Sequence, residues 1–429
     1  MSRALVIVED AGHRDLRPLT DLLPVPALAF GASTLWERWR RAAGVPLLAI
    51  EARAAAMRAW HDAPAPDAVR LSARDPVLVV NAAALPGPWL EEKSASKSPA
   101  IFRARGRFVA ARLDYETVSG GLGRGEGFER FLEGLALPPV EVEARRIERP
   151  WHFVEWNAAA IEQDLGGRPA TLAGERHPFA VVLHPDRVSI EAGARIDPFA
   201  VLDARGGPIR IGPQAVVGPH TVVSGPCVVG AGTQLLGGAV GRSTLGPECR
   251  IAGEVEECIW QGYSNKRHHG FVGHSVIGEW VNLGALTTTS DLKNNYGRVR
   301  VLVDGREEES GVTKLGSLIG AHVKTGIGTL LPTGAAVGVG ANLFGGGRFA
   351  PRHVPAFGWW DGERMAEHRI EAFLATARIA MGRRGRELTS EDEEALRALF
   401  AATAGERGAA AAPGAAAAAA GAAPVERAP

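Results

Sequence analysis

The sequence predicts an α/β domain, then a parallel β-helix, then a short helical region. Three patterns carry this prediction. Apolar strand-like runs alternate with helical segments over residues 1–165, one aliphatic residue recurs every six positions over 181–357, and helical periodicity returns over 358–404. We expect a linker at 166–180, where apolar periodicity is missing, and a disordered Ala/Gly/Pro tail at 405–429.

Composition limits the classes of function. The chain has 429 residues, enough for two or three domains. Its 48 Lys plus Arg balance 48 Asp plus Glu, which argues against nucleic acid or an anionic membrane as the main partner. No apolar run is long enough for a signal peptide or a membrane span, so we expect a cytoplasmic protein. The cysteines have no metal-ligand spacing and suggest buried thiols: Cys227, Cys249 and Cys258.

The N-terminal region is predicted to form a mostly parallel, doubly wound sheet. Residues 4–8 form a continuous apolar run typical of a buried parallel strand, and 46–50 and 76–80 are two further strand candidates. Between them, Ser33–Ala43 is a predicted helix that Ser33 or Thr34 can cap.

Ligands of such sheets bind at the carboxyl ends of the strands. In this chain those ends lead into two loops, Glu9–Arg17 and Asn81–Leu85. We therefore expect these loops to form the ligand-binding edge of the domain.

A six-residue period dominates the middle of the chain. In a parallel β-helix each aliphatic residue of such a repeat points inward, three repeats complete a coil, and stacked coils bury a continuous core. Glycine suits the corners, where positive φ is needed. We expect insertions at 251–271 and 286–316, where the period breaks. The predicted inward residues are Ile190, Ile196, Leu202, Ile211, Val217, Val223, Val229, Leu235, Ile277, Leu283, Ile319, Thr325, Leu331, Val337 and Leu343.

The region after the β-helix is predicted to be helical. One helix is expected over Glu363–Met381, and Ser390 with Glu393 fits a capping box that opens a second.

Four segments together resemble a known family. They are LRPLT at 16–20, PVLVVNAAAL at 76–85, PWHFVEWN at 150–157 and, most specifically, HHGFVGHSVIGEWVNLGALTTTSDLKNNYG at 268–297. They resemble the sugar nucleotidyltransferase family related to the bifunctional N-acetylglucosamine-1-phosphate uridylyltransferase/glucosamine-1-phosphate acetyltransferase, GlmU. Over residues 1–357, the resemblance implies a nucleotidyltransferase-like, Rossmann-like α/β domain followed by a left-handed parallel β-helix.

The resemblance implies roles in the β-helix. His268 matches the family's general base for acyl transfer to a sugar amine, with His269 beside it as a second candidate. Phe271 stands where the family has Tyr, and Asn295-Tyr296 matches a pair that contacts the sugar phosphate.

The residue types agree with these roles. Histidine titrates near neutrality, as a base acting on an amine requires. A sugar phosphate needs cations, for which Lys266, Arg267 and Lys314 are candidates. We expect His274, which follows a glycine in a turn, to be structural.

The N-terminal motif departs from the family pattern. Where the family has loop glycines this chain has Ala11 and His13, and Val25 replaces the Lys of Pro-Lys-Pro. The metal-binding Asp falls in the segment that begins with Asn81, so the metal ligands are left unassigned, although the family implies Mg²⁺. The nucleotide-binding candidates are Asp10, Arg14, Arg17 and Asn81.

Three functions follow, the first preferred. One is a GlmU-like transferase whose β-helix moves acetyl from acetyl-CoA to an amino-sugar phosphate, with an N-terminal domain that has lost part of its motif. The second is an active sugar-1-phosphate nucleotidyltransferase whose β-helix only oligomerises. The third is a non-catalytic sugar-nucleotide-binding scaffold. The resemblance also implies a homotrimer through the β-helix, with small-molecule sugar phosphates or sugar nucleotides as partners.

Overall fold

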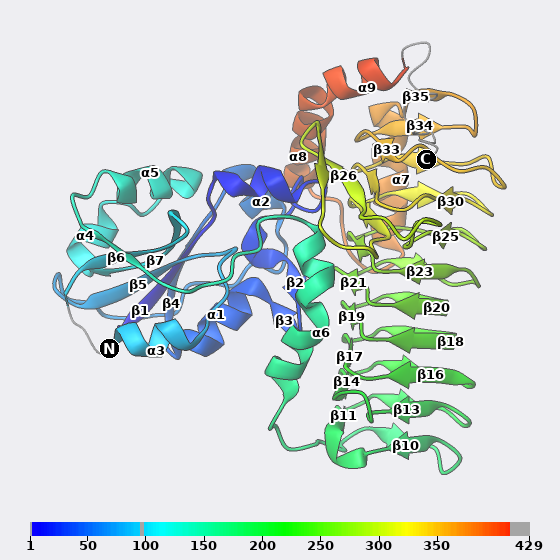
Figure 1. Cartoon of the computed structure of the whole chain (residues 1–429), viewed down its shortest axis with the longest axis horizontal. Helices are drawn as coiled ribbons and strands as arrows, with labels where there is room; N and C mark the ends of the chain where they lie inside the picture. Colours follow the sequence, from blue (N-terminus) through cyan, green and yellow to red (C-terminus); the bar gives the residue numbers. More distant parts are fainter. Residues whose placement is uncertain (1, 95–97, 412–429) are drawn as a thin grey trace, which may run out of the picture. The chain divides into compact units, whose positions relative to one another are not determined.

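The computed structural model describes residues 2–94 and 98–411. The chain divides into two compact units, shown in Figure 1. The first contains residues up to Leu16 and Thr20–His152, and the second contains Arg17–Leu19 and the chain from Phe153 onward. Among the described residues, no helix is long and apolar enough to cross a membrane.

The first unit is built on a six-stranded mixed sheet in the order β4-β1-β5-β7-β6-β8. The strands β4, β1 and β5 are mutually parallel, as the sequence predicts, whereas β7 runs antiparallel to both β5 and β6. The central strand β1 consists of five apolar residues, and all five are buried in the core of the sheet. The bounds are β1 (Ala4–Val8), β4 (Leu47–Glu51), β5 (Pro76–Asn81), β6 (Ala100–Ala104), β7 (Arg107–Asp114) and β8 (Pro139–Glu141).

Short helices complete this unit. The helix α1 (Leu35–Ala43) begins after Thr34, whose hydroxyl accepts from the backbone N–H of Glu37 while the Glu37 carboxylate accepts from Thr34, a capping box. Of the two predicted candidates, Ser33 and Thr34, the residue that caps α1 is therefore Thr34. The other helical segments among the described residues are η1 (Ala11–Leu16), η2 (Val25–Ala27), α2 (Ala54–Ala59), α3 (Pro88–Ser94), α4 (Tyr115–Ser119), η3 (Gly125–Gly127) and α5 (Phe128–Glu133).

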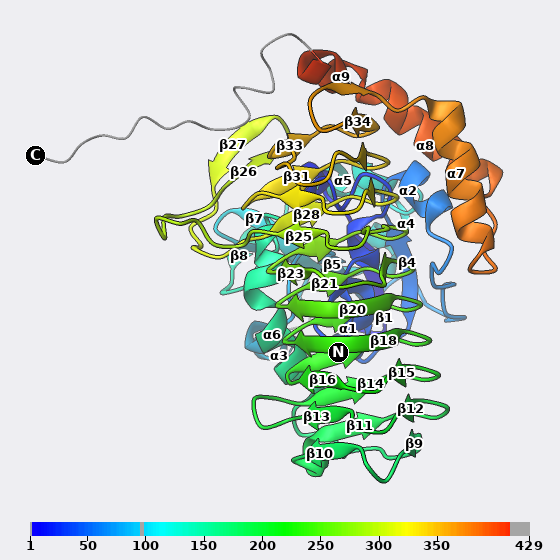
Figure 2. The same ribbon diagram turned by 90° about the vertical axis from the view of Figure 1, so that its right-hand side faces the viewer.

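The second unit begins with α6 (Trp151–Leu165, from Phe153 on) and continues as a parallel β-helix, whose strands stack coil upon coil in Figures 1 and 2. The first coil draws on the segment expected as a linker, because β9 (Glu175–Arg176) pairs with β12. One face is a nine-stranded parallel sheet: β11 (Val188–Ile190), β14 (Ile209–Ile211), β17 (Cys227–Val229), β19 (Thr244–Leu245), β21 (Ile259–Trp260), β24 (Val276–Ile277), β28 (Ser317–Ile319), β31 (Ala335–Val337) and β33 (His353–Val354).

The other two faces share strands that bend round a corner, notably β18 and β20. Their strands are β10 (Val181–Leu183), β12 (Arg195–Ile196), β13 (Val201–Asp203), β15 (Val216–Val217), β16 (Thr221–Ser224), β18 (Gln234–Gly241), β20 (Arg250–Glu256), β22 (Asn265–Lys266), β23 (Phe271–Gly273), β25 (Thr288–Thr289), β29 (Lys324–Thr325), β30 (Leu330–Leu331), β32 (Asn342–Leu343) and β34 (Gly358–Trp360). All the aliphatic residues predicted to point inward are buried. All three cysteines are also buried, and burial raises the pKa of each thiol to about 12.

Of the two insertions expected, one is real. Residues 251–271 continue the coils in register, because β20, β21, β22 and β23 each pair with neighbouring coils. The six-residue period is not visible in this part of the sequence because Trp260 and Lys266 occupy inward positions, which hold aliphatic residues in other coils. The excursion after β25 leaves the coils and contains the hairpin β26 (Arg300–Val303) and β27 (Arg306–Glu309), seen in yellow-green in Figure 2.

The C-terminal region differs from the prediction in detail. Met365–Glu367 is strand β35, antiparallel to β34, so α7 begins only at Ile370 and ends at Gly382. The helix α8 (Ser390–Ala402) is capped by Thr389 with Asp392, one residue before the expected pair. Residues 404–411 form α9 rather than a disordered tail, and 412–429 lie outside the described residues.

Candidate functional site

The carboxyl edge of the N-terminal sheet brings together the two loops expected there. Asp10 follows β1, Asn81 ends β5, and these parallel strands are neighbours. The Asn81 side-chain amide donates to Asp10 Oδ2 at 2.8 Å, and Asn81 Oδ1 accepts from the N–H of Ala83 at 2.8 Å. The loops that follow β1 and β5 therefore lie against each other at this edge.

Asp10 is paired with a residue the sequence did not single out. Arg146 donates to Asp10 Oδ2 at 2.7 Å, and both side chains are 4% exposed. The N–H of Gly12 donates to Asp10 Oδ1 at 3.0 Å. Burial alone would raise the pKa of Asp10, but Arg146 and the hydrogen bonds from Asn81 and Gly12 outweigh it and hold the pKa below its ordinary value. Asp10 is therefore a structural anion whose oxygens are already occupied.

The other nucleotide-binding candidates have separate surroundings. Arg14 is exposed, with no hydrogen bond or ion pair to the described residues. Arg17 falls in the second unit and forms ion pairs with Asp304 at 3.2 Å and Glu406 at 3.1 Å. Val25 is 2% exposed, so this position offers no cation to a ligand.

In the β-helix, Lys266 does not stand where a sugar phosphate could reach it directly. It continues an inward stack after Leu235 and Ile251 and is 1% exposed. Its ammonium donates to the carbonyl oxygens of Ala252 at 2.7 Å and His268 at 3.0 Å. Burial lowers the pKa of Lys266 to about 8. The expectation of a phosphate-binding cation is corrected here, because the ammonium lies inside the coil and holds the corner that carries His268.

That corner presents three exposed side chains in succession: Arg267, His268 and His269. None of the three makes a side-chain hydrogen bond or ion pair to another described residue. The backbone is held from both sides, since the His268 carbonyl accepts from Lys266 and the His269 carbonyl accepts from the N–H of Leu286 at 2.8 Å. The two imidazoles thus stand on a fixed backbone with their ring nitrogens open to a ligand.

A second cluster follows on the same coil. His274 Nδ1 lies 2.7 Å from Asp291 Oδ2, and both side chains are largely buried. A Cβ at Gly273 would come within 2.3 Å of the Phe271 ring and 2.6 Å of Asp291 Oδ2, so the absence of a side chain lets ring and carboxylate close over this strand. Lys314 returns beside Asp291 through the bridge Leu292–Lys314 and stays exposed.

The pKa of Asp291 reflects this cluster. Burial would raise it, but the hydrogen bond and charge of His274, followed by the charge of Lys314, hold it below its ordinary value. His274 was expected to be structural, and it does fasten the start of the excursion to the coil.

The predicted Asn295-Tyr296 pair lies farther along the excursion. Asn295 Oδ1 accepts from the N–H of Gly297 at 3.0 Å, and Tyr296 has a φ of 56° and is 72% exposed. This is a surface turn, and among the described residues no hydrogen bond or ion pair links it to His268. Its role in sugar binding stays a prediction.

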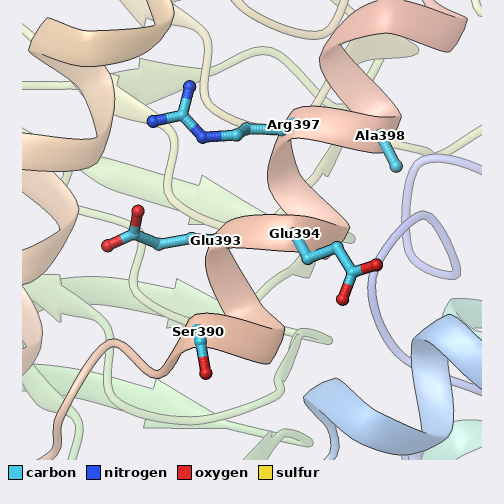
Figure 3. Close-up of a pocket in the computed structure, with 5 residues that line it drawn as sticks. All are labelled: Ser390, Glu393, Glu394, Arg397 and Ala398. Atoms are coloured by element: carbon cyan, nitrogen blue, oxygen red, sulfur yellow. The ribbon is translucent and has the colours of Figure 1, made fainter.

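A surface hollow occurs elsewhere, on the single helix α8 (Figure 3). Its lining residues come from successive turns of that helix, and Glu393 and Arg397 are already paired with Arg378 and Glu371. Figure 3 shows Glu394 and Ala398 directed to the other side of the helix from Glu393 and Arg397, so this hollow has no convergent polar groups. The lining residues are Ser390, Glu393, Glu394, Arg397 and Ala398.

Sequence reasoning missed Arg146 and Asp291. Arg146 lies 136 residues from Asp10, and no local pattern marks it. Asp291 carried a weak signal, since it opens the excursion that interrupts the six-residue period.

Comparison with known proteins agrees with this architecture. Residues 5–168 match the sugar nucleotidyl transferase family model. A bifunctional sugar-1-phosphate nucleotidylyltransferase/acetyltransferase of Sulfurisphaera tokodaii is 29% identical over 205 residues, covering 47% of this chain and 44% of that protein. A bifunctional protein GlmU of Methanococcus vannielii is 32% identical over 136 residues, covering 31% and 28%. The alignments thus span less than half the length of these relatives.

A UDP-N-acetylglucosamine acyltransferase from Campylobacter jejuni covers 54% of this chain and 92% of its own, at 12% identity and a TM-score of 0.27. At those values the likeness has no functional weight. The family model and the sequence relatives carry the comparison: residues 5–168 match the sugar nucleotidyl transferase model, and the chain is similar over part of its length to GlmU and to a bifunctional nucleotidylyltransferase/acetyltransferase.

Proposed function

We propose that the protein is a GlmU-like transferase of sugar-nucleotide metabolism whose β-helix transfers acetyl from acetyl-CoA to the amine of an amino-sugar phosphate. The observation that supports this best is the open pair of imidazoles at His268 and His269 on a braced coil corner, ahead of the His274–Asp291 pair. The bifunctional name of the Sulfurisphaera tokodaii relative adds support.

In the proposed reaction, His268 accepts a proton from the neutral sugar amine as that amine attacks. The amine nitrogen forms a bond to the thioester carbonyl carbon, and the carbon–sulfur bond then breaks. The proton held by the imidazole passes to the departing thiolate, so the products are the amide and free CoA thiol. His269 is the second candidate for the base.

Cations near this corner would hold the sugar phosphate. Arg267 and Lys314 are exposed and have no ion pair with another described residue, which leaves their charges for a phosphate. Asn295 and Tyr296 would contact the same group if the excursion folds over the substrate. Phe271 and the His274–Asp291 pair would form the wall that positions it.

For the N-terminal domain we propose binding of a sugar 1-phosphate or nucleotide sugar. The buried Val25 and the occupied oxygens of Asp10 weigh against strong nucleotidyltransferase activity, since phosphoryl transfer depends on cations and metal at the phosphates. The alternatives remain an active nucleotidyltransferase with an oligomerising β-helix, and a non-catalytic scaffold.

We also propose a homotrimer in the cytoplasm, assembled through the β-helix. Exposed apolar side chains gather on the first coils, where Phe179 stacks on Phe199 and Val181 pairs in register with Val201. Such a patch is a natural contact for another copy of the chain. Light scattering in solution tests the mass directly.

The test of the function is thiol release from acetyl-CoA with a panel of amino-sugar 1-phosphates. The native protein should turn over at least one of them, and the His268→Ala variant should not. Absence of turnover with every sugar would overturn the acyltransferase proposal, and a pyrophosphate-release assay with Mg²⁺ would then separate the two alternatives.

A further inference from the structure

The carboxylates at the edge of the N-terminal sheet do not fit a divalent cation. A sugar nucleotidyl transferase domain implies a metal that neutralises the phosphates, and Mg²⁺ takes carboxylate and water oxygens. Asp10 has both oxygens bonded, to Arg146 and Asn81 on one side and to Gly12 on the other. Among the described residues, no group of three or more His, Cys, Asp or Glu side chains could hold a metal ion.

The neighbouring carboxylates are no better suited. Glu9 is fully buried and accepts from Arg53 at 2.7 Å and from the N–H of Val25 at 2.6 Å. Asp15 lies 3.5 Å from Arg149. Burial, and then the negative charge of Asp10, raise the pKa of Glu129, so this carboxyl group gives up its proton less readily.

Positive charge, by contrast, is left over at the same loop. The two acids that directly follow β1 are each matched by a guanidinium group, Glu9 by Arg53 and Asp10 by Arg146. A Cβ on Gly12 would lie 2.8 Å from Asp10 Oδ1 and 3.2 Å from an Arg107 terminal nitrogen, so Arg107 flanks the glycine directly. The side chains of Arg107 and Arg14 are exposed and make no hydrogen bond or ion pair with another described residue.

We infer that this edge is a metal-independent site for the diphosphate of a nucleotide or nucleotide sugar, contacted by Arg107 and Arg14. Guanidinium groups bind phosphate oxygens through paired hydrogen bonds. Arg146 takes no part in that contact but removes the negative charge that would otherwise demand a cation. The inference deepens the proposed binding role of this domain and rests on it, and it involves no phosphoryl transfer.

The experiment is isothermal titration calorimetry of the full-length protein with inorganic pyrophosphate and, separately, with UDP-N-acetylglucosamine, in buffer containing Mg²⁺ and in buffer containing EDTA. We expect the dissociation constant in EDTA to stay within about twofold of its value in Mg²⁺. Arg107→Ala should raise it about tenfold or more, the loss of one charge-assisted hydrogen-bonding group. Arg105→Ala, which removes an equal charge from the same hairpin, should have less than a threefold effect.

Three results would overturn the inference. Binding that requires Mg²⁺ would restore a metal site, and equal effects of the Arg107 and Arg105 substitutions would reduce the interaction to unspecific charge attraction. If neither pyrophosphate nor UDP-N-acetylglucosamine gave a binding signal in either buffer, the proposed diphosphate site would be refuted. Thiol release by the β-helix is measured separately, so failure here is distinguishable from failure of the acyltransferase proposal.

Discussion

The edge of the N-terminal sheet and the His268 corner of the β-helix both gather ionisable side chains, but they leave different groups unpaired. At the sheet edge Glu9 and Asp10 are matched by guanidinium groups, those of Arg53 and Arg146. At the β-helix corner the exposed imidazoles of His268 and His269 have no partner among the described residues. The comparison teaches that a cluster of charges indicates chemistry only when the group that must react is still free.

The largest effect is expected when the unpaired imidazole of His268 is removed. We expect His268→Ala to lower kcat/KM for thiol release about 10²–10⁴-fold, the usual contribution of a general base. His269→Ala is the matched control and should change the rate less than threefold. The reverse outcome, with His269 the sensitive position, would move the base by one residue.

The next largest effect is expected when the Asp10–Arg146 ion pair at the sheet edge is broken. Arg146→Met leaves Asp10 buried without its cation, which should lower the free energy of unfolding of the first unit by about 3–5 kcal/mol. Urea denaturation followed by circular dichroism measures it. The double variant Asp10→Asn, Arg146→Met should recover part of the loss, since it removes the unpaired charge. An unchanged single variant would contradict the pairing.

Lys266 sharpens the comparison because it is a charge buried without an acidic partner. Its pKa is about 8 in the fold and 10.5 otherwise. Between those pH values the unfolded chain binds a proton that the folded chain does not, so stability should rise with pH. Below pH 8 both states are protonated and the full cost of burial persists.

Lys266→Met should lack this rise. Relative to the variant, the native protein should gain about 3 kcal/mol in unfolding free energy between pH 7.5 and 10.5. Loss of the two carbonyl contacts shifts the curves by a constant and does not affect their difference in slope. Parallel curves of stability against pH would show that the lysine is not buried as described.

The smallest effect is expected at the His274–Asp291 pair, which is proposed to position the substrate in the β-helix site. Asp291→Asn should weaken the hold on His274 and raise KM for the amino-sugar phosphate about tenfold, with kcat changed less than threefold, since one charge-assisted hydrogen bond is lost. Glu309→Gln, on the exposed hairpin of the same excursion, is the control. A fall in kcat with unchanged KM would instead place the pair in the chemical step.

Much of the fold could be predicted because it is periodic. The inward residues from Ile190 to Leu343 were identified by spacing alone, and β1 and β5 by their apolar runs. The coils at 251–271 were missed because Trp260 and Lys266 hide the period, although backbone pairing is unbroken there. Chain spacing also misled at α8, where the cap is Thr389 rather than Ser390.

The sites were less predictable because their pairs are distant or concealed. Asp10 and Asn81 could be brought together from strand order, but Arg146 could not, since its contact depends on a strand connection with no local signal. Lys266 was misjudged because a lysine next to two histidines suggests an exposed cation. Only the coil register places it inside.

The most direct measurement follows two products from one preparation of the full-length protein, in Mg²⁺ and in EDTA. One is CoA thiol from acetyl-CoA with an amino-sugar phosphate, and the other is pyrophosphate from a nucleoside triphosphate with a sugar 1-phosphate. The account predicts thiol release at similar rates in both buffers, its loss in His268→Ala, and pyrophosphate release at background level. Pyrophosphate release in Mg²⁺ without thiol release in either buffer would contradict it.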